Sequence, residues 1–449
     1  MTDAPAPLHA AALTRTLKLP SAAWVLYDTA NTVYAAVLTY LFAPYLGDLL
    51  ESRSAQGVVN SASMVAAGLC VPVFASLADH TGRARLYLVI STLACIGGLT
   101  CFGLQPGGWG AGMLALIAFF VANFGYNAAL VFYNSLLPSV ATEGQQGLVS
   151  GLGVGLGYIG TMIIVVLLDL PEKVGYPATF AIAAGIFFAL ALPCFLLVRE
   201  RRVQSRAPFS FKLVRQQFSA LAVTLRGLPR DRAVMWFLLG NFFCVDVLNT
   251  AILFFGDFTR STFFVNTGAD EWQTRSGQAL NVLGMGIATP GELLKVAGLA
   301  LNFLALLFGV SLGFLTDRWG SLRVLRLSAA FLALGLLGAA LWAGGNLTAY
   351  LLSICVFGSL GLAGIWTAGR KLLIELAPRE RVGEYFGLYG ITTKLSVLGS
   401  AVFGLLFDLV HRQSGSDLLG WQVALGAQAA PLLLGLAFLS RVKLPPKMQ

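Results

Sequence analysis

Two copies of the pattern Asp-x-x-Asn-Thr place acid and amide groups inside long apolar segments of this chain. The first runs from Asp28 to Thr32 and the second from Asp246 to Thr250. An ionised carboxylate near the centre of a lipid-embedded helix costs at least about 2.5 kcal/mol, so such residues mainly face a bundle interior or a watery cavity. One copy in each half of the chain therefore predicts a shared central site, able to bind a proton, a cation or a substrate amine.

Asn31 and Asn249 follow their aspartates by about one helical turn and are expected on the same helix face. The same residues fit a second interpretation, in which Asp28 forms a fixed structural ion pair with Arg370 or Lys394. Lys394 lies too deep in its apolar segment to reach the surface easily. It therefore needs a partner, which the sequence allows to be Asp28, Asp246 or the carboxylate of a substrate.

Further polar side chains fall within two other apolar segments. Tyr126 and Asn127 are expected to line a cavity, whereas Tyr133 and Asn134, nearly two turns further along, are expected at an inner gate. Trp366 and Thr367 precede Pro378 by the same number of residues as Tyr126 and Asn127 precede Pro138. They are therefore expected at the equivalent place in the second half.

The composition of the chain is that of a membrane protein, so these polar side chains must lie within membrane-spanning helices. The 449 residues are 57% hydrophobic and 11% charged, with a mean hydropathy of +0.76, whereas a soluble domain carries about 25% charged residues. Runs of roughly 20 apolar residues are typical of membrane-spanning helices. Twelve are expected, near 22–44, 57–78, 86–105, 110–137, 147–169, 177–198, 233–257, 292–315, 323–344, 347–369, 385–409 and 420–441.

The basic stretch 199–232 divides these spans into two sets of six, an all-α polytopic membrane protein of two pseudo-symmetric bundles. Expected units are a cytoplasmic tail (1–20), a first bundle (21–198), the linker (199–232), a second bundle (233–441) and a tail (442–449). About 23 of the 30 Lys and Arg then lie on cytoplasmic segments, which places both termini inside. Within the linker, apolar residues from Phe211 to Leu225 recur at helical spacing, so the linker is either an interfacial amphipathic helix or loosely ordered.

Enzymatic and nucleic-acid functions find little support. The three histidines are scattered, and the sequence contains no P-loop, zinc-ligand spacing or nucleophile elbow. All six cysteines fall within expected spans and are interpreted as packing residues. The net charge of +9 is explained by topology. No cofactor and no metal are expected; nor is a removable signal peptide, and the first span is expected to direct membrane insertion.

A second repeated element follows the second span of each six-span set. It contains Asp79, Gly82 and Arg83 in the first copy. The second copy contains Asp317, Gly320 and Arg323. Glycine permits a backbone reversal, and each aspartate can accept hydrogen bonds from a neighbouring helix N-terminus or pair with the following arginine. Two copies at equivalent places indicate duplication.

At these residues the sequence resembles the major facilitator superfamily, whose loop between helices two and three reads Gly-x-Leu-Ala-Asp-Arg-x-Gly-Arg-Arg. The resemblance implies two bundles that rock about a site near the membrane midplane, a monomer, and a cytoplasmic latch formed by the six residues of the repeated element. Ala75 and Ser321 depart from the signature.

A narrower resemblance is to the vacuole-effluxer-like transporters, the group of the fungal vacuolar amino-acid exporter. It is carried by Trp24 to Thr32, Phe132 to Pro138, Val149 to Gly160, and Glu384 to Tyr389 with Lys394. Of the family's Ser-Arg pair in the tenth helix only Arg370 is retained, and it is assigned to the gate. Asp246-Val247 replaces Asp-Gly in the seventh helix, and Ser400 replaces a proline in the eleventh, which allows a shifted substrate preference.

The function expected is a secondary active transporter of a small polar solute, with amino acids or similar zwitterions implied by the resemblance. It would work by alternating access in a bacterial cytoplasmic membrane, with proton coupling through Asp28 and Asp246. Its partners would be the solute, protons and membrane lipids, with no nucleic acid. Two alternatives stay open: a lipid translocase that uses the groove between the bundles, and a membrane scaffold or sensor that transports nothing.

Overall fold

The computed structural model describes residues 18–38, 80–103, 109–167, 170–200, 231–268, 271–277, 280–282, 284–396 and 398–444, together with single residues or short stretches within 41–78 and 212–223. Most of the described residues are helical. The first half contains α2 (Leu19–Val37), α5 (Ala84–Gly103), α6 (Trp109–Ser135), the short α7 (Leu137–Val140), η2 (Glu143–Gln145), α8 (Gln146–Val166) and α9 (Leu170–Leu197).

The second half begins with α11 (Arg232–Phe263), which runs past the expected end of span seven. It is followed by α12 (Pro290–Trp319), α13 (Ser321–Trp342), α14 (Leu347–Leu352), the π-helical η3 (Ser353–Gly358), α15 (Ser359–Leu376), η4 (Arg379–Arg381), α16 (Val382–Leu395), α17 (Leu398–Ser414), α18 (Asp417–Ala427) and α19 (Ala429–Ser440). Helices suit this composition because a lipid-embedded backbone must satisfy its own hydrogen bonds.

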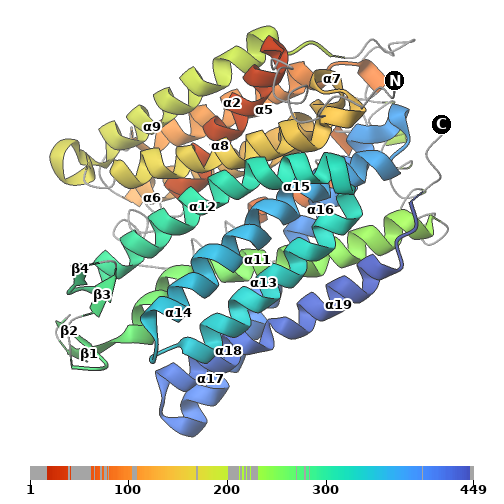
Figure 1. Cartoon of the computed structure of the whole chain (residues 1–449). Helices are drawn as coiled ribbons and strands as arrows, with labels where there is room; N and C mark the ends of the chain where they lie inside the picture. The colour runs from red at the N-terminus through yellow and green to blue at the C-terminus, as the bar shows by residue number, and fades with distance from the viewer. Residues whose placement is uncertain are drawn as a thin grey trace, which may run out of the picture.

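The helices form an integral membrane protein with two groups, one from each half of the chain (Figure 1). Within the described residues, nine helical stretches are long and apolar enough to cross a membrane. Of the other three expected spans, α2 is the first, most of the second lies outside the described residues, and the eleventh is divided between α16 and α17. Exposed apolar side chains such as Ile90 in α5 and Leu334 in α13 present a surface suited to lipid.

The segment after α11 carries a feature that the sequence did not predict. Strands β1 (Phe264–Gly268) and β2 (Glu271–Thr274) form one antiparallel hairpin, and β3 (Leu280–Val282) and β4 (Met285–Ile287) form another. Both lie at one end of the bundles in Figure 1, whereas α7 lies at the other. We call these ends the hairpin end and the α7 end.

Two expected spans differ in continuity and length. The tenth is a single stretch from Leu347 to Leu376, seven residues longer than expected, because η3 joins α14 to α15. The eleventh is broken between Leu395 and Leu398. The apolar residues of the expected linker helix, Phe211 to Leu225, lie outside the described residues, as do the two expected tails for most of their length.

The two groups meet along α8 and α12, which lie side by side in Figure 1. Gly151 of α8 and Gly313 of α12 allow this approach, because a Cβ added to Gly151 would lie 2.6 Å from the Cα of Gly313. Small residues in this arrangement let two helix backbones come into direct contact. Gly309 and Gly155 continue the same contact along the two helices.

Candidate functional site

Asp28 of α2 and Arg370 of α15 form an ion pair across the boundary between the two halves. One guanidinium nitrogen lies 2.7 Å from Asp28 Oδ2 and the other 3.4 Å from Oδ1, so the contact is bidentate. Each side chain is only 7% exposed. Of the two partners that the sequence allowed for an ion pair, Arg370 is the one that the structure supplies.

Aromatic rings enclose this pair. The guanidinium carbon of Arg370 lies 5.6 Å from the ring centre of Tyr133 and 5.9 Å from that of Trp24. The two rings stack at 4.2 Å, and the Trp24 indole N–H donates to the Tyr133 carbonyl oxygen. Gly153 of α8 leaves the space for the carboxylate, because a Cβ there would lie 2.9 Å from Asp28 Oδ2. The pair is therefore buried, which strengthens the attraction between the charges.

Asp317 at the end of α12 makes the second contact between the halves. Its two carboxylate oxygens accept hydrogen bonds of 2.9 and 2.8 Å from the backbone N–H groups of Gly147 and Leu148, at the start of α8. Its Oδ1 also lies 2.6 Å from Nζ of Lys371 in α15. A helix N-terminus favours negative charge because its first N–H groups lack intrahelical partners. We call these four residues the Asp317 cluster.

Among the other residues of the repeated element, the two glycines have the expected backbone conformation, whereas the two arginines lack the expected contacts within the described part of the chain. Gly82 and Gly320 have φ of +60° and +92°, the conformation that a backbone reversal requires. The side chains of Arg83 and Arg323 are exposed and form no ion pair with any described residue, which corrects their expected place in the latch. Arg323 lies in the first turn of α13. Asp79 lies outside the described residues.

Lys371, a buried member of the Asp317 cluster, was missed at the sequence level. The expected tenth span ended at Gly369, which placed Lys371 in a loop, whereas α15 extends to Leu376. The sequence shows two adjacent basic residues at the expected end of this span, and these could have drawn attention to Lys371. Basic residues at span ends are usually exposed topology markers, so the pair was not identified as buried. Here both are buried, Arg370 at 6% exposure and Lys371 also at 6%.

Asp246 does not lie opposite Asp28 in an equivalent role. Its Oδ1 accepts a hydrogen bond of 2.9 Å from the backbone N–H of Gly399, in the first turn of α17. Asn249, one turn further along α11, donates to the hydroxyl of Ser396 at 3.1 Å. Both side chains of the second Asp-x-x-Asn-Thr copy therefore fasten α11 to the break between α16 and α17.

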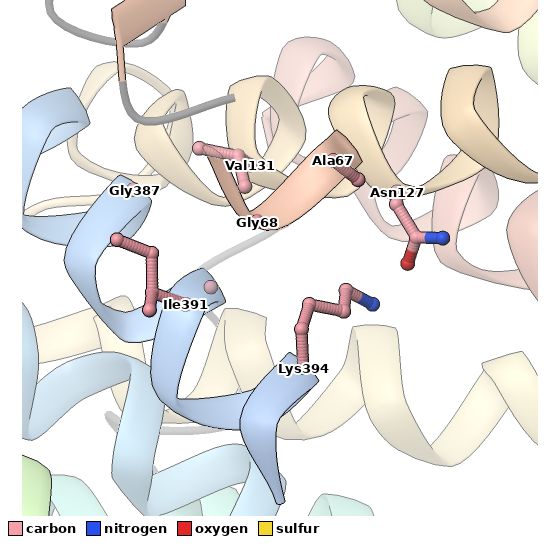
Figure 2. Close-up of a pocket in the computed structure, with 8 residues that line it drawn as sticks. Ala67, Gly68, Asn127, Val131, Gly387, Ile391 and Lys394 are labelled. Atoms are coloured by element: carbon pink, nitrogen blue, oxygen red, sulfur yellow. The ribbon is translucent and has the colours of Figure 1, made fainter. Parts of the chain in front are cut away.

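Lys394 lies in the last turn of α16, directly before this break. The expected ion pair of Lys394 with Asp28 or Asp246 is wrong in this structure, because Asp28 is held by Arg370 and Asp246 faces Gly399. Lys394 instead lines a small cavity between the halves. The first half contributes Ala67, Gly68, Asn127 and Val131, and the second contributes Gly387, Gly390, Ile391 and Lys394 (Figure 2).

The remaining expected site residues lie around these groups. Asn31 is 3% exposed, and its Oδ1 has no hydrogen-bond partner in the described part of the chain. Tyr126 packs against the ring of Tyr34, at 4.8 Å between ring centres. The carbonyl of Thr367 accepts from the hydroxyl of Ser150 in α8, which adds a further contact between the halves. Trp366 is half-buried and packs against the core, and Asn134 is buried.

Asn241 of α11 is a buried polar residue that the sequence did not single out. Its amide is fully buried. It lies beside Gly369 and the Tyr389 hydroxyl, close to Arg370. It lies in the third turn of α11, and without a charge or a repeated motif it gave no signal in the sequence.

Comparisons with known proteins place this geometry in context. The family model described as vacuole effluxer Atg22 like matches residues 46–416. An uncharacterised MFS-type transporter of Bacillus subtilis, YxiO, is 25% identical over 414 residues, which cover 87% of this chain and 89% of that protein. An uncharacterised protein of Aquifex aeolicus is 23% identical over 385 residues, 84% of this chain and 86% of its own length.

Solved structures share the fold at low identity. The human organic anion transporter MFSD10 has a TM-score of 0.68 and 13% identity, with 95% of this chain and 100% of that chain covered. The transporter FucP in its outward conformation has a TM-score of 0.64 and 14% identity, with 95% and 99% covered. The proton:xylose symporter XylE has a TM-score of 0.65 and 13% identity, with 95% of each chain covered.

Proposed function

Because the chain belongs to the vacuole effluxer Atg22-like family and has the major facilitator fold, we propose that it carries a small polar solute, an amino acid or similar zwitterion, by alternating access. The observation that carries the proposal is the buried Asp28–Arg370 pair, whose two members belong to opposite halves. A protein in which the halves move apart at this level must break that pair and form it again in each cycle. Membership of a transporter family also argues against an enzyme.

The conformation of the structure fits one end of such a cycle. The Asp28–Arg370 pair, the Asp317 cluster and the contact of α8 with α12 hold the halves together toward the α7 end. We assign this end to the cytoplasm from the distribution of Lys and Arg. The structure would then represent a state that is closed to the cytoplasm.

Proton coupling follows from the chemistry of the pair. An ionised Asp28 is stabilised by Arg370, whereas a protonated Asp28 loses most of that attraction. Protonation therefore favours separation of α2 from α15, and a proton entering from one side would release the α7 end. Asp246 has no equivalent basic partner among the described residues, so we assign coupling to Asp28 and a structural function to Asp246.

The test is counterflow in vesicles reconstituted with the full chain, across a panel of amino acids, short peptides, sugars and metal ions at two pH values. We expect flux of at least one zwitterion, and we expect Asp28→Asn to abolish the flux or its pH dependence. Asp408→Asn, at an exposed site in α17, is the matched control and should behave as wild type. Unchanged flux and pH dependence in Asp28→Asn would rule out the coupling mechanism.

The same vesicles discriminate the two alternative functions. Movement of labelled lipid headgroups without solute flux would identify a lipid translocase. No movement of either solute or lipid, under conditions where the protein is folded, would identify a scaffold or sensor.

A further inference from the structure

Lys394 and Asn127 face each other from opposite halves across the small cavity, and their chemistry is complementary to a zwitterion. We propose that Lys394 binds the carboxylate of the transported solute and that the Asn127 side-chain oxygen accepts from its ammonium group. This inference rests on the transport function proposed above and assigns the two ends of the ligand to residues. Figure 2 shows the ends of both side chains pointing toward one another.

The charge of Lys394 is the first step of the argument. Its Nζ makes no ion pair or hydrogen bond with any described residue. The two carboxylates that the sequence allowed as its partners are both engaged elsewhere, Asp28 with Arg370 and Asp246 with the Gly399 N–H. An ammonium group within a membrane bundle requires a partner or a watery cavity, and an anionic ligand group can supply that partner.

The orientation of the Asn127 amide is the second step. Its NH₂ donates to the carbonyl oxygen of Asn123 at 2.7 Å, and this bond determines which way the amide is turned. The side-chain oxygen of Asn127 is thereby left on the side of Lys394, buried and without a partner in the described part of the chain (Figure 2). Asn127 is only 2% exposed. An unpartnered buried acceptor is costly, and a ligand N–H group would remove that cost.

The position of the cavity is the third step. One wall comes from α6 and residues 67–68, and the other comes from α16. Gly390 allows α16 to approach α6 closely, because an added Cβ would lie 3.3 Å from a methyl of Val131. The cavity has room for about one water molecule in this state. An amino acid can therefore enter only as α6 and α16 separate, which is the movement that alternating access requires.

The break after Lys394 supports the same assignment. Transporter sites are commonly built where a membrane helix is discontinuous, because the interruption frees polar groups at the membrane interior. Here α16 ends one residue after Lys394, and the Asp246 contact with α17 holds the second segment in place. The lysine therefore lies at the point of the eleventh span where the backbone can change direction.

The experiment uses the purified full chain and three matched sets of probes: the twenty standard L-amino acids, their deaminated carboxylic acids and their methyl esters. Binding is measured as the ligand-dependent rise in thermal unfolding temperature, which does not require transport. We expect amino acids to bind better than deaminated acids. Amino-acid methyl esters, which lack the carboxylate, should bind at least about tenfold more weakly than the corresponding amino acids.

Variants assign the two ends of the ligand. Lys394→Met should weaken amino-acid binding about 10- to 100-fold, to the level of the methyl ester, and Lys394→Arg should restore part of it. Asn127→Ala should weaken binding of amino acids while leaving binding of deaminated acids unchanged. Lys295→Met, at an exposed position of α12, is the matched control and should bind as wild type.

The outcomes separate this inference from the proposed function. Three results would each overturn the assignment. They are methyl esters that bind as well as the amino acids, a Lys394→Met variant with unchanged affinity for amino acids, and a wild-type protein that binds none of the three sets. Counterflow that proceeds with an unchanged KM in Lys394→Met would leave transport intact and reject the site. Binding that follows the expected pattern without any flux would support the site and reject transport.

Discussion

Gly151 of α8 and Gly313 of α12 lie backbone to backbone across the boundary between the two halves. A Cβ added to Gly313 would lie 2.7 Å from the carbonyl oxygen of Gly147 and 2.9 Å from the Cα of Gly151, so neither position has room for a side chain. The glycines and the Asp317 cluster lie at the same end of these helices. Closure of the α7 end therefore depends on the absence of side chains as much as on the presence of charges.

The first prediction concerns this contact. Gly151→Val should prevent the α7 end from closing, because two methyl groups would occupy the position of the α12 backbone. Spin labels at Gly144 and Glu380, in the exposed turns before α8 and α16, measure the opening by electron resonance. We expect a longer distance in the variant than in wild type.

The control for this variant is Gly185→Val in α9. Gly185 is exposed on the outside of the bundle, and an added Cβ would meet nothing within 4 Å. The label distance should remain that of wild type. A Gly151→Val protein with the wild-type distance would show that the glycine contact does not govern closure.

The second prediction concerns the Asp317 cluster. Asp317→Asn loses the ion pair with Lys371 and retains an acceptor oxygen for only one of the two N–H groups at the start of α8. Charge-assisted hydrogen bonds contribute about 1.5–3 kcal/mol each, so the open population at the α7 end should rise at least about tenfold. A cysteine at buried Ser150, in a background free of other cysteines, reports the opening through its rate of maleimide labelling.

An exposed ion pair at the same end provides the comparison. Arg379 contacts Glu143 across the two halves, but these side chains are 70% and 77% exposed. Pairs of this kind contribute only about 0–1 kcal/mol. Arg379→Gln should therefore leave the labelling rate nearly unchanged. Equal effects of Arg379→Gln and Asp317→Asn would mean that burial of the cluster is unimportant.

The fold was largely predictable because a membrane imposes a strong pattern on a sequence. Apolar runs and the placement of Lys and Arg indicated two six-span halves, and the helices and the structural neighbours agree with the major facilitator fold. The break in the eleventh span was not predicted. The sequence has no proline at residues 395–397. The residues of α11 that contact Ser396 and Gly399, Asn249 and Asp246, are about 150 residues distant in sequence.

The partners within the site were less predictable than its residues. Both Arg370 and Lys394 were chemically acceptable partners for Asp28. In the structure Arg370 reaches it from α15, which contacts α8 through the Ser150–Thr367 hydrogen bond. The two Asp-x-x-Asn-Thr copies suggested equal roles for Asp28 and Asp246. In the structure Asp28 contacts a buried arginine, whereas Asp246 contacts the N-terminus of a helix. A repeated motif indicates duplication, but it does not determine which residues surround each copy.

The third prediction tests the Asp28–Arg370 pair as an energetic unit. Asp28→Asn leaves a buried guanidinium without its counter-charge, and removing one partner of such a pair costs about 3–5 kcal/mol. The double variant Asp28→Asn with Arg370→Gln removes both charges and should recover much of this loss. Chemical or thermal unfolding of the purified protein measures the difference. A double variant that is less stable than wild type by the sum of the losses in Asp28→Asn and Arg370→Gln would show that the residues do not interact.

The fourth prediction separates the two aspartates. Asp246 satisfies a backbone N–H at the start of α17, so Asp246→Ala should lower the free energy of unfolding by about 1 kcal/mol, as expected for loss of a helix cap. Asp246→Asn keeps a side-chain oxygen and should lose only a fraction of that amount.

Solute flux distinguishes a cap from a proton carrier. If Asp246 acts only on α17, Asp246→Asn retains flux with the pH dependence of wild type, whereas Asp28→Asn alters it. Gly399→Ala provides an independent check, because an added Cβ would collide with the Asp246 carboxylate. It should therefore reproduce the stability loss of Asp246→Ala without removing the carboxylate. A change of pH dependence in Asp246→Asn as large as that in Asp28→Asn would instead assign proton coupling to both halves.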